Sequence, residues 1–118
     1  MFYLLIGIGA FVGAISRQLM SSYLSKLLFF GFPAGTLLVN VTGCYLIGMF
    51  LAINLNNKDL VSPLLLIGFL GSFTTFSAFT KEIFLFSNVN GVFVSYLVSL
   101  IISSTCVFST FLGFKMFS

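Results

Sequence analysis

The chain has 118 residues, of which 59% are hydrophobic and only 6% are charged, and its mean hydropathy is +1.21. A soluble domain usually carries about 25% charged residues, so this composition excludes one. The net charge of +3 comes from five scattered basic residues, which form no patch for nucleic acid. We therefore expect a multi-pass protein of the cell membrane with no nucleic-acid partner.

Four apolar segments reach the roughly 20 residues that a helix needs to cross about 30 Å of hydrocarbon. No soluble domain or low-complexity linker lies between these segments. The sequence therefore predicts an all-α membrane protein with a single four-helix transmembrane domain over residues 1–118. The predicted spans are residues 2–23, 33–54, 62–86 and 92–114.

Proline, serine and asparagine mark the expected boundaries of the spans. Pro33 is suited to the first position of the second helix, and Ser62 and Pro63 are typical of an N-cap followed by the first helical residue. Residues 54–59 form the most polar loop, and residues 88–91 are expected to be a turn.

The lysine and arginine residues give only a weak signal for orientation in the membrane. An even number of spans places Lys58 and Lys115 on one side, together with both termini, and Lys26 on the other. Arg17 and Lys81 lie at uncertain depth. Two interpretations stay open: a short protein with few charges, or a chain that inserts both ways and pairs with an inverted copy.

Glycines recur in the first two spans at spacings that allow close approach of helices. Gly9 and Gly13 form a small-xxx-small pattern, and Gly43 and Gly48 lie on the second span. Packing between two copies and packing within one chain explain these glycines equally well.

The third span contains a glycine-punctuated, hydroxyl-rich stretch, residues 68–79, which reads Gly-Phe-Leu-Gly-Ser-Phe-Thr-Thr-Phe-Ser-Ala-Phe. Lipid offers the backbone no hydrogen-bond partners, so this composition predicts a helix that is broken near Thr74 and Thr75. The break directs the carbonyls of one half-helix to one site and the amides of the other half to another.

We expect no enzymatic activity, because the chain has no histidine, only two carboxylates and no plausible pair of nucleophile and base. Glu82 lies beside Lys81, which indicates local charge compensation. The other three spans contain no carboxylate, which counts against a small secondary exporter of cations or drugs. Cys44 and Cys106 lie in predicted spans and are interpreted as small apolar fillers.

Polar and aromatic residues of the second and third spans are candidates for contact with an ion. Thr36 and Asn40 are four residues apart and share a helix face. Asn40 fits an interhelical hydrogen bond and a ligand contact equally well. Phe76 and Phe79 share a face on either side of Ser77, and their ring edges carry partial positive charge that suits a small anion.

Hydroxyl groups recur every four residues on the fourth span, at Ser95, Ser99 and Ser103. This stripe fits a polar path through the membrane as well as serines packed between helices. The pattern alone does not choose between them.

Taken together, residues 13–17, 35–43 and 68–79 resemble the Fluc/CrcB family of fluoride channels in order, spacing and chain length. The third-span motif carries most of this resemblance, which covers essentially the whole chain. Ala78 stands where many members of the family have threonine.

The resemblance implies a passive fluoride channel that lowers the cytoplasmic fluoride concentration and works as an antiparallel dimer in the lipid membrane. The partner is a second copy of the chain or a paralogous subunit. A small secondary exporter and a non-transporting accessory subunit are the alternatives.

The resemblance also implies roles for individual residues. A structural Na⁺, which is not transported, is held by the backbone carbonyls of Gly71 and Thr74, and Arg17 lies in the vestibule. The resemblance does not fix which of the fourth-span hydroxyls, Tyr96, Ser99 and Ser103, face the pore. The fluoride pathway is implied to contain Asn40, Phe76, Phe79, Thr36, Ser77, Ser99 and Ser103.

Overall fold

The computed structural model describes residues 1–24, 26, 28–29, 32–54 and 62–118. These residues form a helical protein with one small pair of strands, β1 and β2, which run antiparallel with Leu28 opposite Pro33. The elements in chain order are α1 (Phe2–Leu24), β1 (Leu28–Phe29), β2 (Phe32–Pro33), α2 (Ala34–Asn54), η1 (Ser62–Leu70), α3 (Gly71–Phe73), α4 (Phe76–Asn90) and α5 (Val92–Phe117).

Four helical stretches of the described chain are long and apolar enough to cross a membrane. The longest dimension of the molecule is 47 Å, which suits a bilayer of about 40–45 Å including its headgroup regions. The prediction of an all-α, multi-pass membrane protein is therefore confirmed. The observed stretches are Phe2–Leu24, Ala34–Ile53, Ser62–Asn90 and Val92–Phe117.

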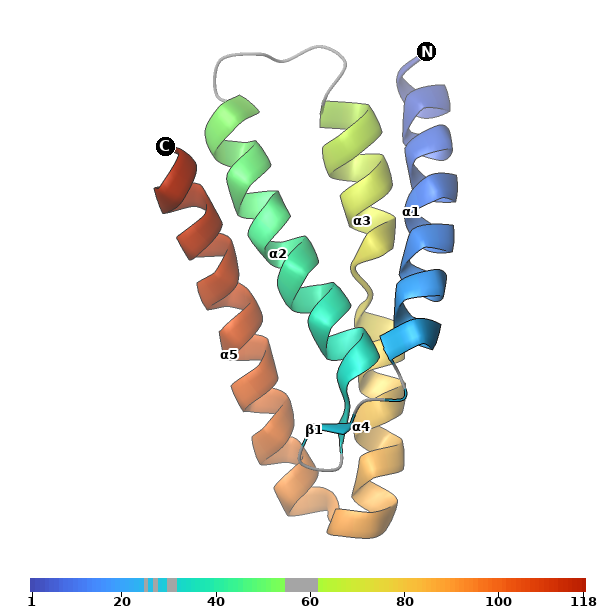
Figure 1. Cartoon of the computed structure of the whole chain (residues 1–118), viewed down its shortest axis with the longest axis vertical. Coiled ribbons are helices and arrows are strands. Elements are labelled where there is room, and N and C mark those ends of the chain that lie inside the picture. The colour runs from blue at the N-terminus through green and yellow to red at the C-terminus, as the bar shows by residue number, and fades with distance from the viewer. Residues whose placement is uncertain (25, 27, 30–31, 55–61) are drawn as a thin grey trace.

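The helices pack in two groups. Helix α2 lies along α5, and α1 lies along η1 and α3, while α4 continues the third span downward against α5 (Figure 1). Both termini lie toward the same end of the molecule, and the turn between α4 and α5 lies at the opposite end (Figure 1). The third span thus contacts both groups, through η1 and α3 at one end and α4 at the other.

Close contact between α2 and α5 depends on one glycine from each helix. A Cβ atom on Gly48 would overlap the carbonyl oxygen of Thr110, and one on Gly113 would overlap the carbonyl oxygen of Tyr45. Small residues at helix contacts let backbones approach closely in a membrane, where association depends on packing. The register of α2 against α5 is therefore fixed at this level.

The small-xxx-small pattern of α1 is used in the same way, within one chain. A Cβ on Gly9 would overlap the carbonyl oxygen of Leu64, and one on Gly13 would overlap that of Phe69. Of the two explanations for these glycines, packing within the chain is the one found here.

Two predicted boundaries are wrong. Residues 88–90 continue α4, and the chain turns only at Gly91, whose φ of 88° is left-handed and suits a residue without a Cβ. The Gly91 amide still donates to the Ser87 carbonyl at 2.9 Å, so the helical hydrogen bonding of α4 continues up to the turn. Helix α5 extends to Phe117, since Lys115 in its last turn complements the negative end of the helix.

The start of the second span also differs from expectation. Pro33 belongs to β2, and α2 begins at Ala34. The third span begins at Ser62, and its first nine residues form a π-helix. Most of the predicted polar loop, including Lys58, lies outside the described residues.

Candidate functional site

The backbone leaves helical geometry at Thr74 and Thr75, between α3 and α4. Thr74 has φ −79° and ψ 145°, and Thr75 has φ −146° and ψ 126°, both extended conformations. The ribbon shows this segment as an unwound stretch between the two halves of the third span (Figure 1). The amide and the hydroxyl of Thr74 both donate to the Leu70 carbonyl, at 3.1 and 2.9 Å.

The side chain of Asn40 on α2 stabilises this interruption with two reciprocal hydrogen bonds. Its Nδ2 donates to the Thr75 carbonyl at 3.0 Å, and its Oδ1 accepts from the Thr75 amide at 2.9 Å. Asn40 is buried, so both backbone groups would otherwise lack partners. The interhelical hydrogen bond considered for Asn40 is therefore present, and its second N–H remains as a possible donor to a ligand.

The interruption releases two carbonyl groups from helical hydrogen bonding. In a continuous helix, the amides of Thr75 and Ala78 would donate to the carbonyls of Gly71 and Thr74, four residues earlier. Here the Thr75 amide donates to Asn40, and the Ala78 amide donates to the Thr75 hydroxyl at 3.4 Å. The carbonyls of Gly71 and Thr74, predicted to bind a cation, are the ones whose helical partners are diverted.

The first residues of α4 form the positive end of the second half-helix. Thr75 is the N-cap, and its hydroxyl also lies 3.2 Å from that of Ser77. Amides at a helix N-terminus attract anions, because they lack partners in the preceding turn. The interruption thus places a site suited to a cation next to one suited to an anion.

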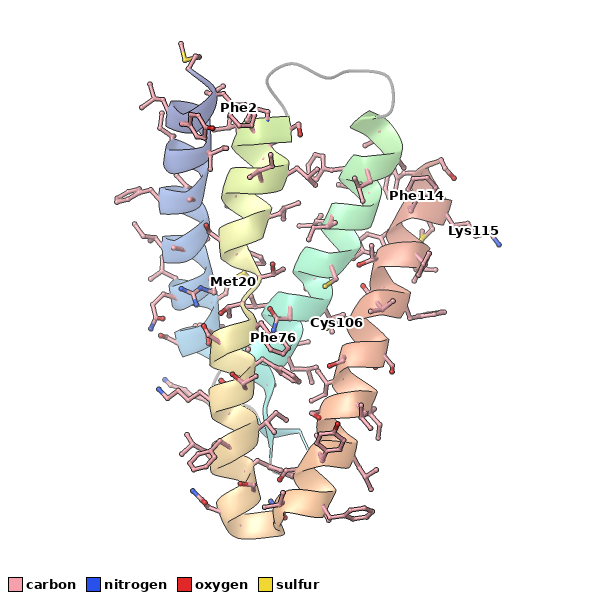
Figure 2. The ribbon with its side chains drawn as sticks, turned by 180° about the vertical axis from the view of Figure 1, so that it is seen from behind. Phe2, Met20, Phe76, Cys106, Phe114 and Lys115 are labelled. Carbon is pink, nitrogen blue, oxygen red and sulfur yellow. The ribbon has the colours of Figure 1, made fainter. Side chains whose placement is uncertain are left out.

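A cleft of about 290 Å³ lies beside the interruption, between α2, α4 and α5. Phe79 is buried and Phe76 is 74% exposed, with ring centroids 6.0 Å apart. Figure 2 shows Phe76 just past the interruption and Cys106 on the helix facing it. The residues that line the cleft are Asn40 and Cys44 of α2, Thr74, Thr75, Phe76 and Phe79 of the third span, and Ile102, Ser103 and Cys106 of α5.

The cleft brings together four of the seven residues predicted for the fluoride pathway, namely Asn40, Phe76, Phe79 and Ser103. Ser77 lies near its edge through its contact with the Thr75 hydroxyl. Thr36 and Ser99 do not line the cleft.

On α5, the hydroxyl stripe is used mainly within the helix. Ser95 is buried and donates to the Gly91 carbonyl at 2.8 Å, and Ser99 donates to the Tyr96 carbonyl at 2.7 Å. The Tyr96 side chain is exposed. Only Ser103 of this stripe reaches the cleft.

Glu82 was missed as a candidate by the sequence analysis. Its Oε1 accepts a hydrogen bond of 2.7 Å from the buried Thr36 hydroxyl, so the carboxyl contacts another span. Its Oε2 is buried and has no partner in the described part of the chain. The available signal was the spacing of Glu82 three residues after Phe79, which places it on the inward face of α4.

Arg17 is half-buried on α1, and its Nε is buried without a hydrogen-bond partner among the described residues. It lies one helical turn beyond Gly13, which packs against Phe69 of η1.

No group of three or more His, Cys, Asp or Glu side chains gathers within the described ranges.

These features define a multi-pass membrane protein whose third span is interrupted beside a cleft. The chain belongs to the CrcB-like protein family, also described as Camphor Resistance, whose family model matches residues 4–114. A similar protein from Campylobacter lari is named a fluoride-specific ion channel and is 38% identical over 97% of this chain and 95% of its own length. A protein of the same name from Coxiella burnetii is 39% identical over 93% of this chain and 92% of its own.

The hydrogen bonds of Asn40 predict the effect of removing its amide. Asn40→Ala leaves the Thr75 amide and carbonyl without partners, at a cost of about 1–3 kcal/mol for each group. We expect a clear fall in the melting temperature of the purified protein in detergent. Ser103→Ala is the matched control, since the Ser103 hydroxyl lines the same cleft without a hydrogen bond in the described chain. Equal melting temperatures for both variants would contradict the assigned role of Asn40.

Proposed function

We propose that this protein is a channel that lets fluoride leave the cell passively across the cell membrane. The observation that carries the proposal is the interruption at Thr74 and Thr75, which opens the N-terminus of α4 beside a cleft with hydrogen-bond donors. Membership of the CrcB-like family and the names of the similar proteins from Campylobacter lari and Coxiella burnetii support the same function.

The donors around the cleft suit a small, strongly hydrated anion. Fluoride entering a membrane must exchange its water for other donors, and the free N–H of Asn40, the Ser103 hydroxyl and the amides of α4 are available. The edges of Phe76 and Phe79 add partial positive charge. No charged side chain lines the cleft in the described part of the chain, so nothing there would hold the anion too tightly to pass.

Export of fluoride requires no other energy source under this proposal. A membrane potential that is negative inside favours the exit of an anion by roughly 2.3 kcal/mol per 100 mV. The channel would therefore lower the cytoplasmic fluoride concentration by conduction alone.

We further propose that two copies assemble as an antiparallel dimer. The near balance of basic residues between the two sides is compatible with insertion in both orientations. The cleft of one chain is bounded by three helices and leaves Phe76 largely exposed. An inverted second copy would cover this aromatic ring.

A structural Na⁺ between the two copies completes the proposal. Gly71 is exposed on the single chain, and its carbonyl and that of Thr74 are free of helical partners. Two copies would supply four carbonyl oxygens, the type of ligand that a hard cation prefers. The ion would neutralise the negative ends of two half-helices and would not be transported.

Fluoride efflux from liposomes tests the channel function. Vesicles that contain this chain alone and are loaded with potassium fluoride, with valinomycin present to compensate charge, should release fluoride rapidly without a proton gradient. The variant carrying Phe76→Ile and Phe79→Ile should be tight, because aliphatic side chains have no positive ring edges. A fluoride electrode measures both.

Two results would indicate an alternative function, and a third would contradict the role of the phenylalanine rings. Efflux that requires a proton gradient indicates an exporter, and tight vesicles indicate an accessory subunit or an obligate paralogous partner. Unchanged efflux in the double phenylalanine variant would contradict the role of the rings.

The orientation of the termini tests the antiparallel dimer. In a background with Cys44→Ser and Cys106→Ser, we expect Ser118→Cys to be labelled in about half of the molecules by an impermeant maleimide added to intact cells. Light scattering of the purified protein should give two chains per particle. Complete labelling, or none, would show a single orientation and refute the proposal.

Exchange of the cation tests the structural Na⁺. A ligand that binds only the folded assembly raises its stability as the concentration increases. We expect the melting temperature and the dimer fraction to rise with Na⁺ concentration and to fall when choline replaces it at constant ionic strength. Identical stability in the two salts would argue against the site.

A further inference from the structure

The two cysteines of the chain meet on one wall of the cleft. Cys44 on α2 and Cys106 on α5 are the only cysteines in the sequence, and both line the cleft as free, half-buried thiols. The two thiols face the same cleft from α2 and α5, which pack against each other. The interpretation of each as an isolated apolar filler is therefore incomplete.

The packing of α2 against α5 fixes the positions of the two helices close to these thiols. The Ser109 hydroxyl donates to the Val41 carbonyl at 2.9 Å. Gly48 fits against the Thr110 carbonyl, where any Cβ would overlap. The juxtaposition of the sulfur atoms therefore follows from the fixed register of the two helices.

We propose that Cys44 and Cys106 form a two-sulfur binding site for a soft monovalent metal cation, such as Ag⁺ or Cu⁺. Thiolates select soft cations over hard ones, and these two ions accept linear coordination by two sulfur atoms. Zinc usually takes four ligands, and no third His, Cys, Asp or Glu joins the pair among the described residues. The site therefore favours Ag⁺ or Cu⁺ over zinc.

The charge balance of the site also favours a monovalent ion. In the free protein, both cysteines are free thiols. Binding of Ag⁺ breaks the S–H bond of one thiol, forms one silver–thiolate bond and one bond to the remaining thiol, and releases one proton to water. The site keeps the same total charge, which matters because added charge is costly inside a membrane. No electron is transferred in this step.

Occupancy of this site would close the cleft. Cys44 lies one turn beyond Asn40, and Ser103 and Cys106 both line the cleft from α5. A metal ion bridging α2 and α5 would fill the space beside the donors and tie the two helices together. This consequence rests on the proposed channel function, whereas binding of the metal does not.

Silver is the probe, because Ag⁺ needs no reductant to hold its oxidation state. Titration of the purified full-length protein in chloride-free nitrate buffer should show one Ag⁺ bound per chain. Binding should protect both thiols from a maleimide. Removal of a residue that only supports a metal ligand lowers metal affinity by about 10–100-fold. Loss of one of the two direct ligands, in Cys44→Ser or Cys106→Ser, should therefore weaken Ag⁺ binding by at least about tenfold.

The variant with both substitutions is free of cysteine and serves as the control. It should bind no Ag⁺ at the concentration that saturates the native protein. Retained binding in this variant, or independent binding of one Ag⁺ by each thiol, would overturn the proposal, as would a native protein whose two thiols are already oxidised to a disulfide.

Fluoride efflux supplies a separate readout. Ag⁺ should slow efflux by at least about tenfold in native vesicles, and excess dithiothreitol should restore it, because a free thiol competes for the metal. The cysteine-free variant should conduct in the presence of Ag⁺. Absence of efflux before Ag⁺ is added would refute the proposed channel, but the binding titration would still decide whether the metal site exists.

Discussion

Two reciprocal hydrogen bonds between the Asn40 amide and the backbone of Thr75 make the interrupted third span possible. A lipid bilayer offers no partner to an exposed amide or carbonyl, and each unsatisfied group costs several kcal/mol. Asparagine suits this position because it presents one donor and one acceptor on a short, planar group. An aspartate would only accept, and a serine would not span both backbone groups at once.

The same contact that stabilises the interruption also produces its polarity. Because the Thr75 amide bonds to Asn40, the Gly71 carbonyl is left without its helical donor. Because the Thr75 hydroxyl caps α4, the Thr74 carbonyl loses the Ala78 amide in the same way. A carbonyl end and an amide end are thus exposed a few residues apart without any charged side chain. Under the proposed function, this polarity would let a neutral stretch of membrane helix bind ions of both signs.

The sequence predicted the parts of this arrangement that depend on the membrane itself. Hydroxyls and glycines within an apolar span are costly unless the backbone needs them, and this rule located Thr74 and Thr75. Pairing across elements was harder to predict, because helical spacing gives a face and not a partner. The hydrogen bond between Thr36 and Glu82 shows the limit: the neighbouring Lys81 suggested a local role for a carboxyl that contacts a residue 46 positions away.

The hydroxyl stripe on α5 illustrates a second limit. A serine in a helix can satisfy its hydroxyl with a carbonyl of the preceding turn, so its presence does not show what it faces. Ser95 and Ser99 both do this, whereas Ser103 of the same stripe reaches the cleft. Regular spacing was therefore informative about the face and uninformative about the function of each member.

The groups left without partners support the proposed pairing of two copies. Buried polar atoms are normally hydrogen-bonded, yet Arg17 Nε and Glu82 Oε2 have no partner in the described chain. Phe76 is largely exposed although it lies on the interrupted span, and Gly71, whose carbonyl has lost its helical donor, is exposed too. Scattered defects would suggest imperfect packing, but exposed Phe76 and Gly71 flank the one interruption in the third span. A two-fold axis places the same surface on both partners, so a contact centred on the interruption would cover each copy with the matching region of the other.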